Sequence, residues 1–312
     1  SWKTWSGELY LGADNLDVAR LTRPIPDARK LLKSGRGSTR TWIKFQDGTP
    51  SELTSYLGLS DVLLTFSPDS EPLQVKTLST RLTETFTEGE LHAKAENLDF
   101  ELSDGTEAHD LLLQTVVHTA ATPDAETHRS GFSIARLDVE TLKKLLPSVP
   151  FPKSAADLIH QHEASGTISN FEVSWLGSPG KTQDWRIKTD FSGLTVAHNS
   201  PENEKIFFSG VENLSGSLEV AAKRGRVTFA TQKGAVSIPG VFENPRLPLD
   251  SLTGAVSWQL SQASETDNEK VAITFDNVAV SNEDLSVSAQ GSWQQNDTAA
   301  GHINLTGRIE HL

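Results

Sequence analysis

The chain contains no cysteine and no methionine. The first absence rules out disulfides, thiolate metal sites and a cysteine nucleophile, and it leaves the redox compartment open. Because the sequence starts at Ser1 rather than at a methionine, we expect a processed product or a fragment of a longer protein. The sequence also lacks a recognisable signal peptide and an apolar run of about 20 residues, the length that a membrane-spanning helix requires. Any anchor or export signal is therefore expected in another part of the parent chain.

Positive charge is also scarce. The chain has 28 Lys and Arg residues against 41 Asp and Glu residues, which gives a net charge of −13. Such an acidic chain is a poor partner for nucleic acid, whose phosphates require a basic surface. One basic cluster runs from Arg20 to Lys44, and we interpret it as a solvated loop and helix face. Contact with anionic lipid headgroups or with an acidic partner is the alternative.

A spaced pattern recurs along the chain. In three segments, apolar or small residues fall at offsets 0, 2, 4, 7 and 9, with Asn at offset 6. The Asn positions are Asn15, Asn97 and Asn277, and a fourth segment has Gly193 in the same position. A weaker fifth copy centres on Asn213. The regular spacing indicates a repeated structural unit.

Each copy predicts a strand, a kink and a second strand. Residues two apart lie on the same face of a strand. The step of three across Asn or Gly would turn the second strand over, unless a bulge or tight turn takes up one residue. Asn and Gly tolerate the positive φ that such a point needs. The kink therefore keeps the apolar sides of both strands on one face.

Helices are expected to be few and short. Local start and stop signals predict helices at about 50–57, 139–146 and 155–164. The first of these begins at the capping box Thr49–Glu52, which has Pro at the first helical position.

The C-terminal part predicts an antiparallel meander from about Lys205 to Trp293. We expect turns at Lys223–Arg226 and at Lys233–Gly234, and a polar loop at Ser261–Lys270. The hydrophobic content of 36% is low, but it fits strands with one face in water.

The predicted fold is mainly β: an elongated, twisted antiparallel sheet that curls into a groove, with a few short helices. A β-rich repeat segment is expected over residues 1–150 and a β-meander repeat segment over residues 151–312. We expect one continuous elongated sheet rather than two independent domains.

Several predicted strand-and-turn segments have a similar sequence pattern. They are Leu249–Trp258, Asn282–Asp284, Gly291–Trp293, Gly166–Trp175 and Phe191–Leu194. These segments resemble the AsmA-like superfamily and in particular its YhdP branch. The resemblance is best over residues 130–312.

The resemblance implies a large envelope protein of a Gram-negative bacterium, anchored in the inner membrane and extending across the periplasm. Such proteins are similar to bridge-like lipid transporters, in which a curled β-sheet forms an apolar groove for phospholipid acyl chains. The YhdP branch is associated with phospholipid movement toward the outer membrane. Membrane contact is then expected through terminal regions outside this sequence, and envelope proteins are further candidate partners.

Catalytic and metal signatures are weak. His160–Glu163 is the best metal-like cluster, but histidines two apart on a helix do not share a face. Lys33–Thr39 resembles a phosphate loop only superficially, because it lacks the Gly-Lys-Ser/Thr ending, and we interpret it as a flexible basic turn. The sequence has no Gly-x-Ser-x-Gly elbow, no His-Glu-x-x-His motif and no calcium loop. We expect no catalytic residue, no metal site and no cofactor.

The leading hypothesis is a segment of a periplasmic bridge that moves phospholipids between membranes, with acyl chains against the inward face of its strands. The predicted groove residues are Leu218, Val220, Val227, Phe229, Val256, Trp258, Val271, Ile273 and Phe275. One alternative is a closed, non-catalytic β-scaffold or binding module of an envelope assembly. A glycan-active enzyme is the other alternative, because its paired carboxylates would meet only in three dimensions.

Overall fold

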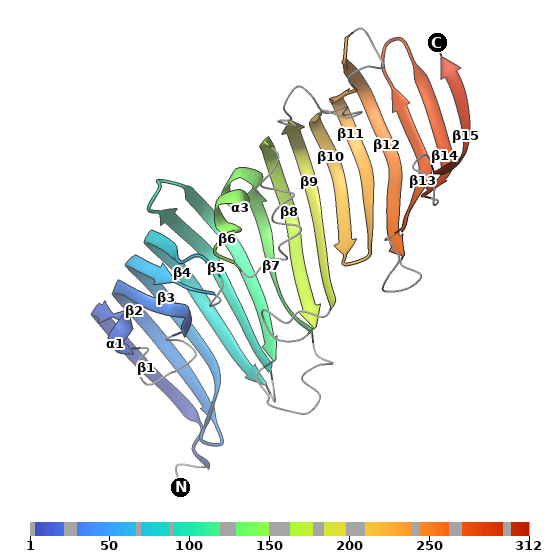
Figure 1. The fold of residues 1–312 in the computed structure, drawn as a ribbon. Helices are drawn as coiled ribbons and strands as arrows, with labels where there is room; N and C mark the ends of the chain where they lie inside the picture. The colour runs from blue at the N-terminus through green and yellow to red at the C-terminus, as the bar shows by residue number, and fades with distance from the viewer. Residues whose placement is uncertain are drawn as a thin grey trace. The chain divides into compact units, whose positions relative to one another are not determined.

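A computed structural model describes most of the chain. The described residues are 4–21, 30–66, 70–87, 90–118, 129–149, 163–176, 184–197, 210–238, 244–261, 270–295 and 301–311. The elements, labelled in Figure 1, are β1 (Gly7–Asp17), α1 (Val18–Leu21), β2 (Leu32–Gln46), β3 (Thr49–Leu64), β4 (Leu73–Thr87), β5 (Glu90–Leu102), β6 (Glu107–His118), β7 (Arg129–Asp138), α3 (Val139–Leu145), β8 (Glu163–Leu176), β9 (Asp184–Ala197), β10 (Gly210–Ala221), β11 (Arg224–Ser237), β12 (Arg246–Ser261), β13 (Lys270–Ser281), β14 (Ser286–Gln294) and β15 (His302–His311).

The strands pair in the order of the chain. Within the described residues, each strand from β1 to β15 is hydrogen-bonded to the next one, in a 15-stranded open antiparallel sheet without crossovers. The predicted fold class is therefore confirmed: the chain is mainly β and forms an antiparallel sheet with a few short helices.

Two compact units make up the chain. Unit 1 comprises Ser1–Leu137, Thr141–Ala156 and Glu172–Asp184. Unit 2 comprises Asp138–Glu140, Asp157–Phe171 and Trp185–Leu312. The predicted division near residue 150, and the expectation that the two halves are not independent domains, stay predictions.

The predicted kinks lie within the strands. Asn97, Asn213, Asn277 and Gly193 all have positive φ, at 48°, 54°, 46° and 61°. At the first copy the β1–β2 register shifts between Ala13 and Leu16, on either side of Asn15. The strand–kink–strand interpretation is therefore confirmed at these positions.

The β13–β14 register shows what a kink does to the apolar side. Phe275 pairs with Gly291, and Val278 pairs with Ala289. Gly291 and Ala289 are two residues apart on β14, so they share a face. Phe275 and Val278 consequently share a face too, although three residues separate them.

Further kinks were not predicted from the sequence. Asp61, Asp110 and Lys233 have positive φ at positions where the residue is not Asn, and Asn170 also has positive φ. The predicted turn at Lys233–Gly234 is wrong, because both residues lie inside β11, which pairs with β12 along its length.

The predicted helix at about 50–57 is also wrong, since these residues belong to β3. The capping box is a local signal, whereas β3 forms register pairs with β2 on one side and β4 on the other. Pro50 lies at the start of the strand, where the loss of one amide donor is tolerated. The helix at about 139–146 is confirmed as α3, and the one at about 155–164 lies outside the described residues, apart from its last two, which belong to β8.

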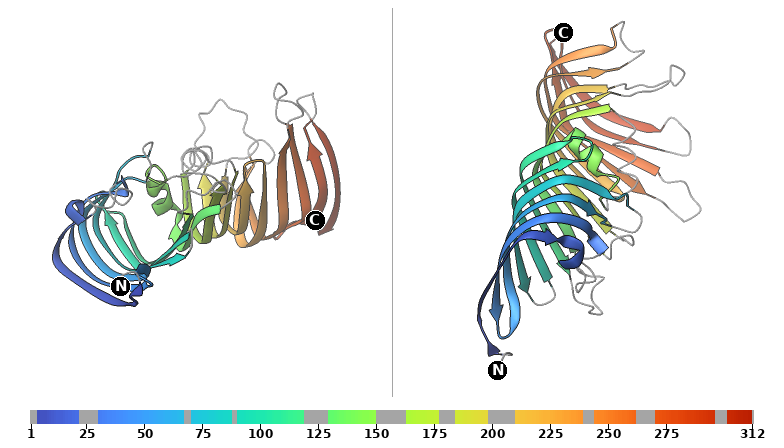
Figure 2. Two further views of the ribbon diagram at one scale, coloured as in Figure 1. Left: turned by 90° about the horizontal axis from the view of Figure 1, so that it is seen from below. Right: turned by 90° about the vertical axis from the view of Figure 1, so that its left-hand side faces the viewer.

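Helices α1 and α3 pack on one end of the unit 1 sheet. Val18 of α1 is 1% exposed and forms a buried cluster with Leu59, Val62 and Val75 of the strands. Leu145 of α3 packs against the same cluster. Figure 2 shows the curvature of these strands and the helices beside their ends.

Candidate functional site

The predicted groove residues all belong to unit 2, and the register places them on one face of its sheet. Leu218, Val227, Val256 and Phe275 are successive cross-strand partners from β10 to β13. A second row runs through Val220, Gly225, Trp258 and Ile273. Phe229 follows Val227 by two residues, and Val271 pairs with Leu260, two residues after Trp258. Residues two apart on a strand share a face, so all nine lie together on what we call the unit 2 face.

Each of these nine side chains is half-buried. A hydrophobic cluster in unit 2 has four fully buried members, none of which belongs to the nine: Phe191, Leu214, Leu249 and Leu252. The partly buried side chains packed against these four also come from strands β9 to β13. Within the described ranges all strands belong to one sheet, so no second sheet covers this face.

The Trp258 ring lies over the neighbouring strand β11, at Gly225. A Cβ atom added to Gly225 would come within 2.1 Å of the Trp258 ring. The absence of a side chain at Gly225 therefore lets the indole lie flat on the unit 2 face. This arrangement adds a broad apolar surface to the row that contains Val220 and Ile273.

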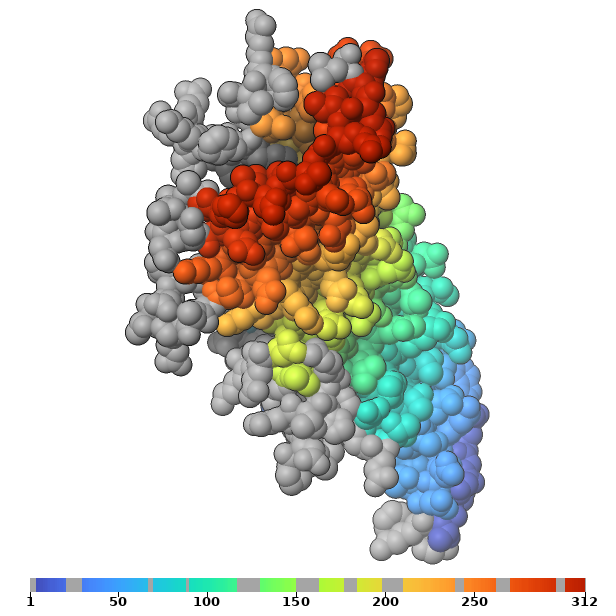
Figure 3. Space-filling model, turned by 90° about the vertical axis from the view of Figure 1, so that its right-hand side faces the viewer, coloured from blue at the N-terminus to red at the C-terminus, as the bar shows by residue number. Residues whose placement is uncertain are grey.

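The apolar rows continue to the edge strand β15. Ile303 pairs with Trp293, and Leu305 pairs with Gly291. Ile303 is 60% exposed and Leu305 is 45% exposed, and Figure 3 shows β15 at the surface of unit 2. The unit 2 face therefore includes apolar side chains that are open to solvent.

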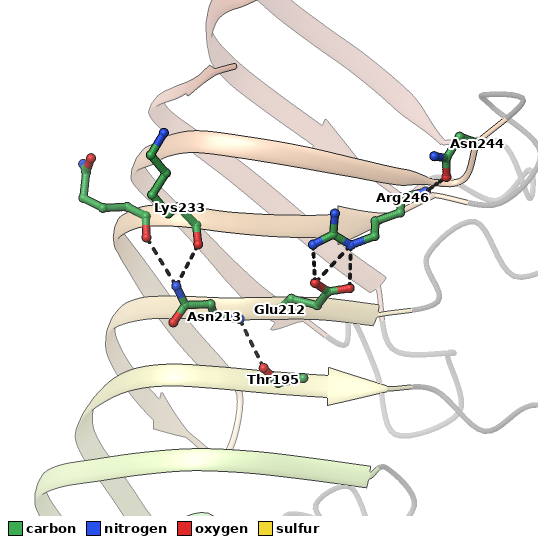
Figure 4. A network of polar contacts seen from close by, with 7 residues as sticks. Thr195, Glu212, Asn213, Lys233, Asn244 and Arg246 are labelled. Carbon is green, nitrogen blue, oxygen red and sulfur yellow. Dashed lines mark hydrogen bonds and ion pairs between the residues drawn. The ribbon is translucent and has the colours of Figure 1, made fainter. Parts of the chain in front are cut away.

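The opposite face of unit 2 is charged. Arg226 forms an ion pair with Asp276 at 2.6 Å. Arg226 directly precedes Val227, and Asp276 directly follows Phe275, so both charged residues lie on the face opposite to those apolar residues. Arg246 binds Glu212 through three hydrogen bonds of 2.6 to 3.1 Å (Figure 4), and this arginine holds the pKa of Glu212 below its usual value. Exposed pairs such as these contribute little to stability, because water and salt screen them. Their main consequence here is a solvated outer face.

Polar side chains also hold the kinks in place. The Asn213 amide group donates to the backbone oxygen of Lys233 at 2.7 Å, so the kink of β10 is joined to the kink of β11 (Figure 4). The backbone nitrogen of Asn213 donates to Thr195 Oγ1 on the other side. Asn213 thus supplies both the backbone conformation of the kink and a cross-strand hydrogen bond.

Unit 1 has a corresponding face, which is less uniform. Its strands place Leu11, Thr41, Ser55, Leu82 and Ala95 in one row of direct partners. The Thr41 and Ser55 hydroxyls are buried and hydrogen-bonded to each other at 2.8 Å.

The next row of this face contains a carboxylate. It runs through Leu9, Ile43, Leu53, Glu84 and Ala93. We call the sheet face that carries both rows the unit 1 face. Burial raises the pKa of Glu84 above its usual value.

Glu84 is not among the site residues predicted from the sequence. The sequence does contain a signal for this position. Leu82, Glu84 and Phe86 are spaced two apart on one strand, and Leu91 and Ala93 have the same spacing on the next. Strand periodicity places all of these side chains on one face.

The remaining candidates carry no site. Lys33–Thr39 lies within β2, so the predicted basic turn is wrong. Gly37 is needed there because an added Cβ atom would lie 2.0 Å from the Gly58 oxygen. His160 and His162 lie outside the described residues, and the described part of the chain holds no group of three or more potential metal-binding side chains.

The basic cluster from Arg20 to Lys44 is described only in part, because residues 22–29 fall outside the described ranges. Three of its members have acidic partners: Arg20 pairs with Asp17, Arg40 with Asp14, and Lys44 with Glu52. These exposed pairs fit the solvated interpretation of the cluster.

Fold and surface together define a class of protein: an open antiparallel sheet, whose described strands pair in chain order, with an apolar face in unit 2. The model of the YhdP protein family matches residues 1–312, and the chain belongs to this family of bacterial envelope proteins. No curated protein and no solved structure matches the chain. None of the described helices has the length and apolar character needed to cross a membrane.

Proposed function

We propose that this chain is a segment of a periplasm-spanning, inner-membrane-anchored protein that conducts phospholipids between the inner and outer membranes. In this proposal the acyl chains lie on the unit 2 face, against the nine side chains from Leu218 to Phe275 named above. The observation that carries the proposal is that these side chains share one face, are all half-buried, and have no second sheet over them among the described residues.

The energetics of lipid transfer favour such a surface. Moving an acyl chain through water costs about 0.8 kcal/mol per CH₂ group, or on the order of 10 kcal/mol for a chain of about 16 carbons. An apolar face removes most of this cost without strong, specific contacts. Kinks that keep successive apolar residues on one side extend the face along the whole length of each strand.

Family membership supports the same function, because the YhdP family is of a transport type and is not a family of enzymes. The alternative is a non-catalytic scaffold that holds an envelope partner. A scaffold has no need for half-exposed apolar side chains in register across four strands.

Photo-crosslinking tests the proposal directly. A photoreactive residue at Phe275 should capture phospholipid, and mass spectrometry should identify the adduct. The matched control places the same residue at Thr274, which is exposed on the opposite face. We expect the Phe275 yield to exceed the Thr274 yield roughly tenfold, as for about two additional CH₂ groups in contact. Equal yields, or no lipid at Phe275, would exclude the unit 2 face as a lipid path.

A further inference from the structure

Glu84 is a charged residue in an otherwise uncharged part of the unit 1 face. Its direct partners are Leu53 on β3 and Ala93 on β5. Leu82 and Phe86 lie on the same face, two residues to either side on β4. The side chain is half-buried, and the cause of its raised pKa is burial.

No cation of the described residues neutralises this carboxylate. Arg81 is three residues away on β4 and therefore lies on the other face, where it binds Glu96 at 2.7 Å. Lys94 pairs with Thr83 in the register, so it lies on the other face as well, and it also binds Glu96. Within the described part of the chain, Glu84 forms no hydrogen bond or ion pair.

The corresponding row of unit 2 contains no such group. At the same distance from the ends of their strands, β12 and β13 carry Trp258 and Ile273. A purely acyl-binding surface does not need a carboxylate, and leaving one unpaired costs free energy. This difference points to a polar ligand for Glu84.

The position of Glu84 on its strand suits a headgroup. Thr87, the last residue of β4, lies three positions after Glu84, which corresponds to about 10 Å. Phe86, two positions closer to the end than Glu84, is 39% exposed. A lipid with its acyl chains on the sheet face would hold its headgroup near this edge, where water remains accessible.

We propose that Glu84 binds the ammonium headgroup of a phospholipid, and so makes the unit 1 face selective for lipids that carry a primary amine. The inference rests on the proposed function. An ammonium group supplies the missing positive charge and N–H donors, and charge-assisted hydrogen bonds are among the stronger ones in proteins. A headgroup with only negative charge would be repelled by the same carboxylate.

Competition between two lipids tests this selectivity. The 312-residue chain is incubated with vesicles of equimolar phosphatidylethanolamine and phosphatidylglycerol, and the lipids that copurify with it are quantified by mass spectrometry. Glu84→Gln should lower the ratio of bound phosphatidylethanolamine to phosphatidylglycerol roughly two- to fivefold, as expected for one partly exposed ion pair. Total bound lipid should stay unchanged. The control Glu172→Gln removes an exposed carboxylate from β8, and it should leave the ratio unchanged.

Titration of the Glu84 carboxyl by NMR provides a second readout. Phosphatidylethanolamine should lower the pKa of Glu84, because a bound cation favours the ionised form. Phosphatidylglycerol should not lower it.

The outcomes separate this inference from the proposed function. An unchanged lipid ratio in Glu84→Gln, with lipid still bound, overturns the headgroup site alone. A chain that binds no lipid overturns both.

Discussion

At the scale of single residues, the kink positions explain why Asn recurs in the sequence. A left-handed backbone is strained for most side chains, but Asn and Gly adopt it readily. Asn213 adds a hydrogen bond from its amide group to the backbone of the neighbouring kink. Gly193 supplies the conformation without the bond. The two contributions are therefore separable by substitution.

Substitution at Asn213 should separate them. Asn213→Gly keeps the conformation and loses the hydrogen bond, which contributes about 1 kcal/mol. Asn213→Ala also introduces left-handed strain of about 1 kcal/mol, so its loss of unfolding free energy should be about 2 kcal/mol. Urea unfolding followed by circular dichroism measures both. Equal stability of the Ala and Gly variants would contradict a role for the positive φ.

At the scale of elements, close approach between strands places strict limits on particular glycines. Gly37 of β2 has a φ of 155°, and its hydrogen faces the Gly58 oxygen of β3. Among the described residues, the one atom within 4 Å of a Cβ added to Gly58 is Ser38 Oγ, at 3.6 Å. These two glycines of one strand pair thus have different roles.

Alanine substitutions at the two positions form a matched pair. Gly37→Ala forces β2 and β3 apart and should lower the free energy of unfolding by about 2–4 kcal/mol, in the range of severe backbone strain. Gly58→Ala should change it by less than about 1 kcal/mol, because an ordinary contact results. Thermal unfolding of the two variants gives the comparison. A smaller effect at Gly37 than at Gly58 would show that the strand spacing adapts.

The accuracy of the sequence predictions follows the range of the interactions involved. Strand periodicity and the Asn kinks depend on local backbone geometry, so they were predictable at Asn97, Asn213 and Asn277. The helix expected at about 50–57 failed because pairing with β2 and β4 outweighs a local capping signal. The kink at Lys233 was missed because a lysine at positive φ is held there by its neighbours, including Asn213. Period two alone predicted that the proposed groove residues share a face. The isolation of Glu84, in contrast, depends on which face of the sheet each neighbouring cation occupies.

At the scale of the whole molecule, the two sides of the sheet can be tested separately. In unit 2 one face is apolar and the other is charged. Ile273 and Thr274 are adjacent in sequence but belong to different faces of β13. A substitution at each position therefore tests one face in the intact protein.

Ile273→Asp should interrupt lipid passage in the full-length protein while the sheet still forms. Loss of contact equivalent to about two CH₂ groups, together with a charge in the path, should lower phospholipid delivery roughly tenfold. Thr274→Asp adds the same charge to the solvated face and should have little effect. Delivery is measured from the phospholipid content of the outer membrane, and folding from circular dichroism of the purified chain. If Ile273→Asp unfolds the chain, this face is a structural core.

Pairing in chain order also has a consequence for folding. Every strand finds its partner in the segment made just before it, so the order of assembly can follow the order of synthesis. Local contacts of this kind favour fast folding, because few long loops must close. A growing sheet of this type has one unpaired leading edge at any moment, and each new hairpin moves that edge forward. Because each strand pairs with its neighbours in sequence, whole hairpins can be added to or removed from such a sheet without changes to the strands that are already paired.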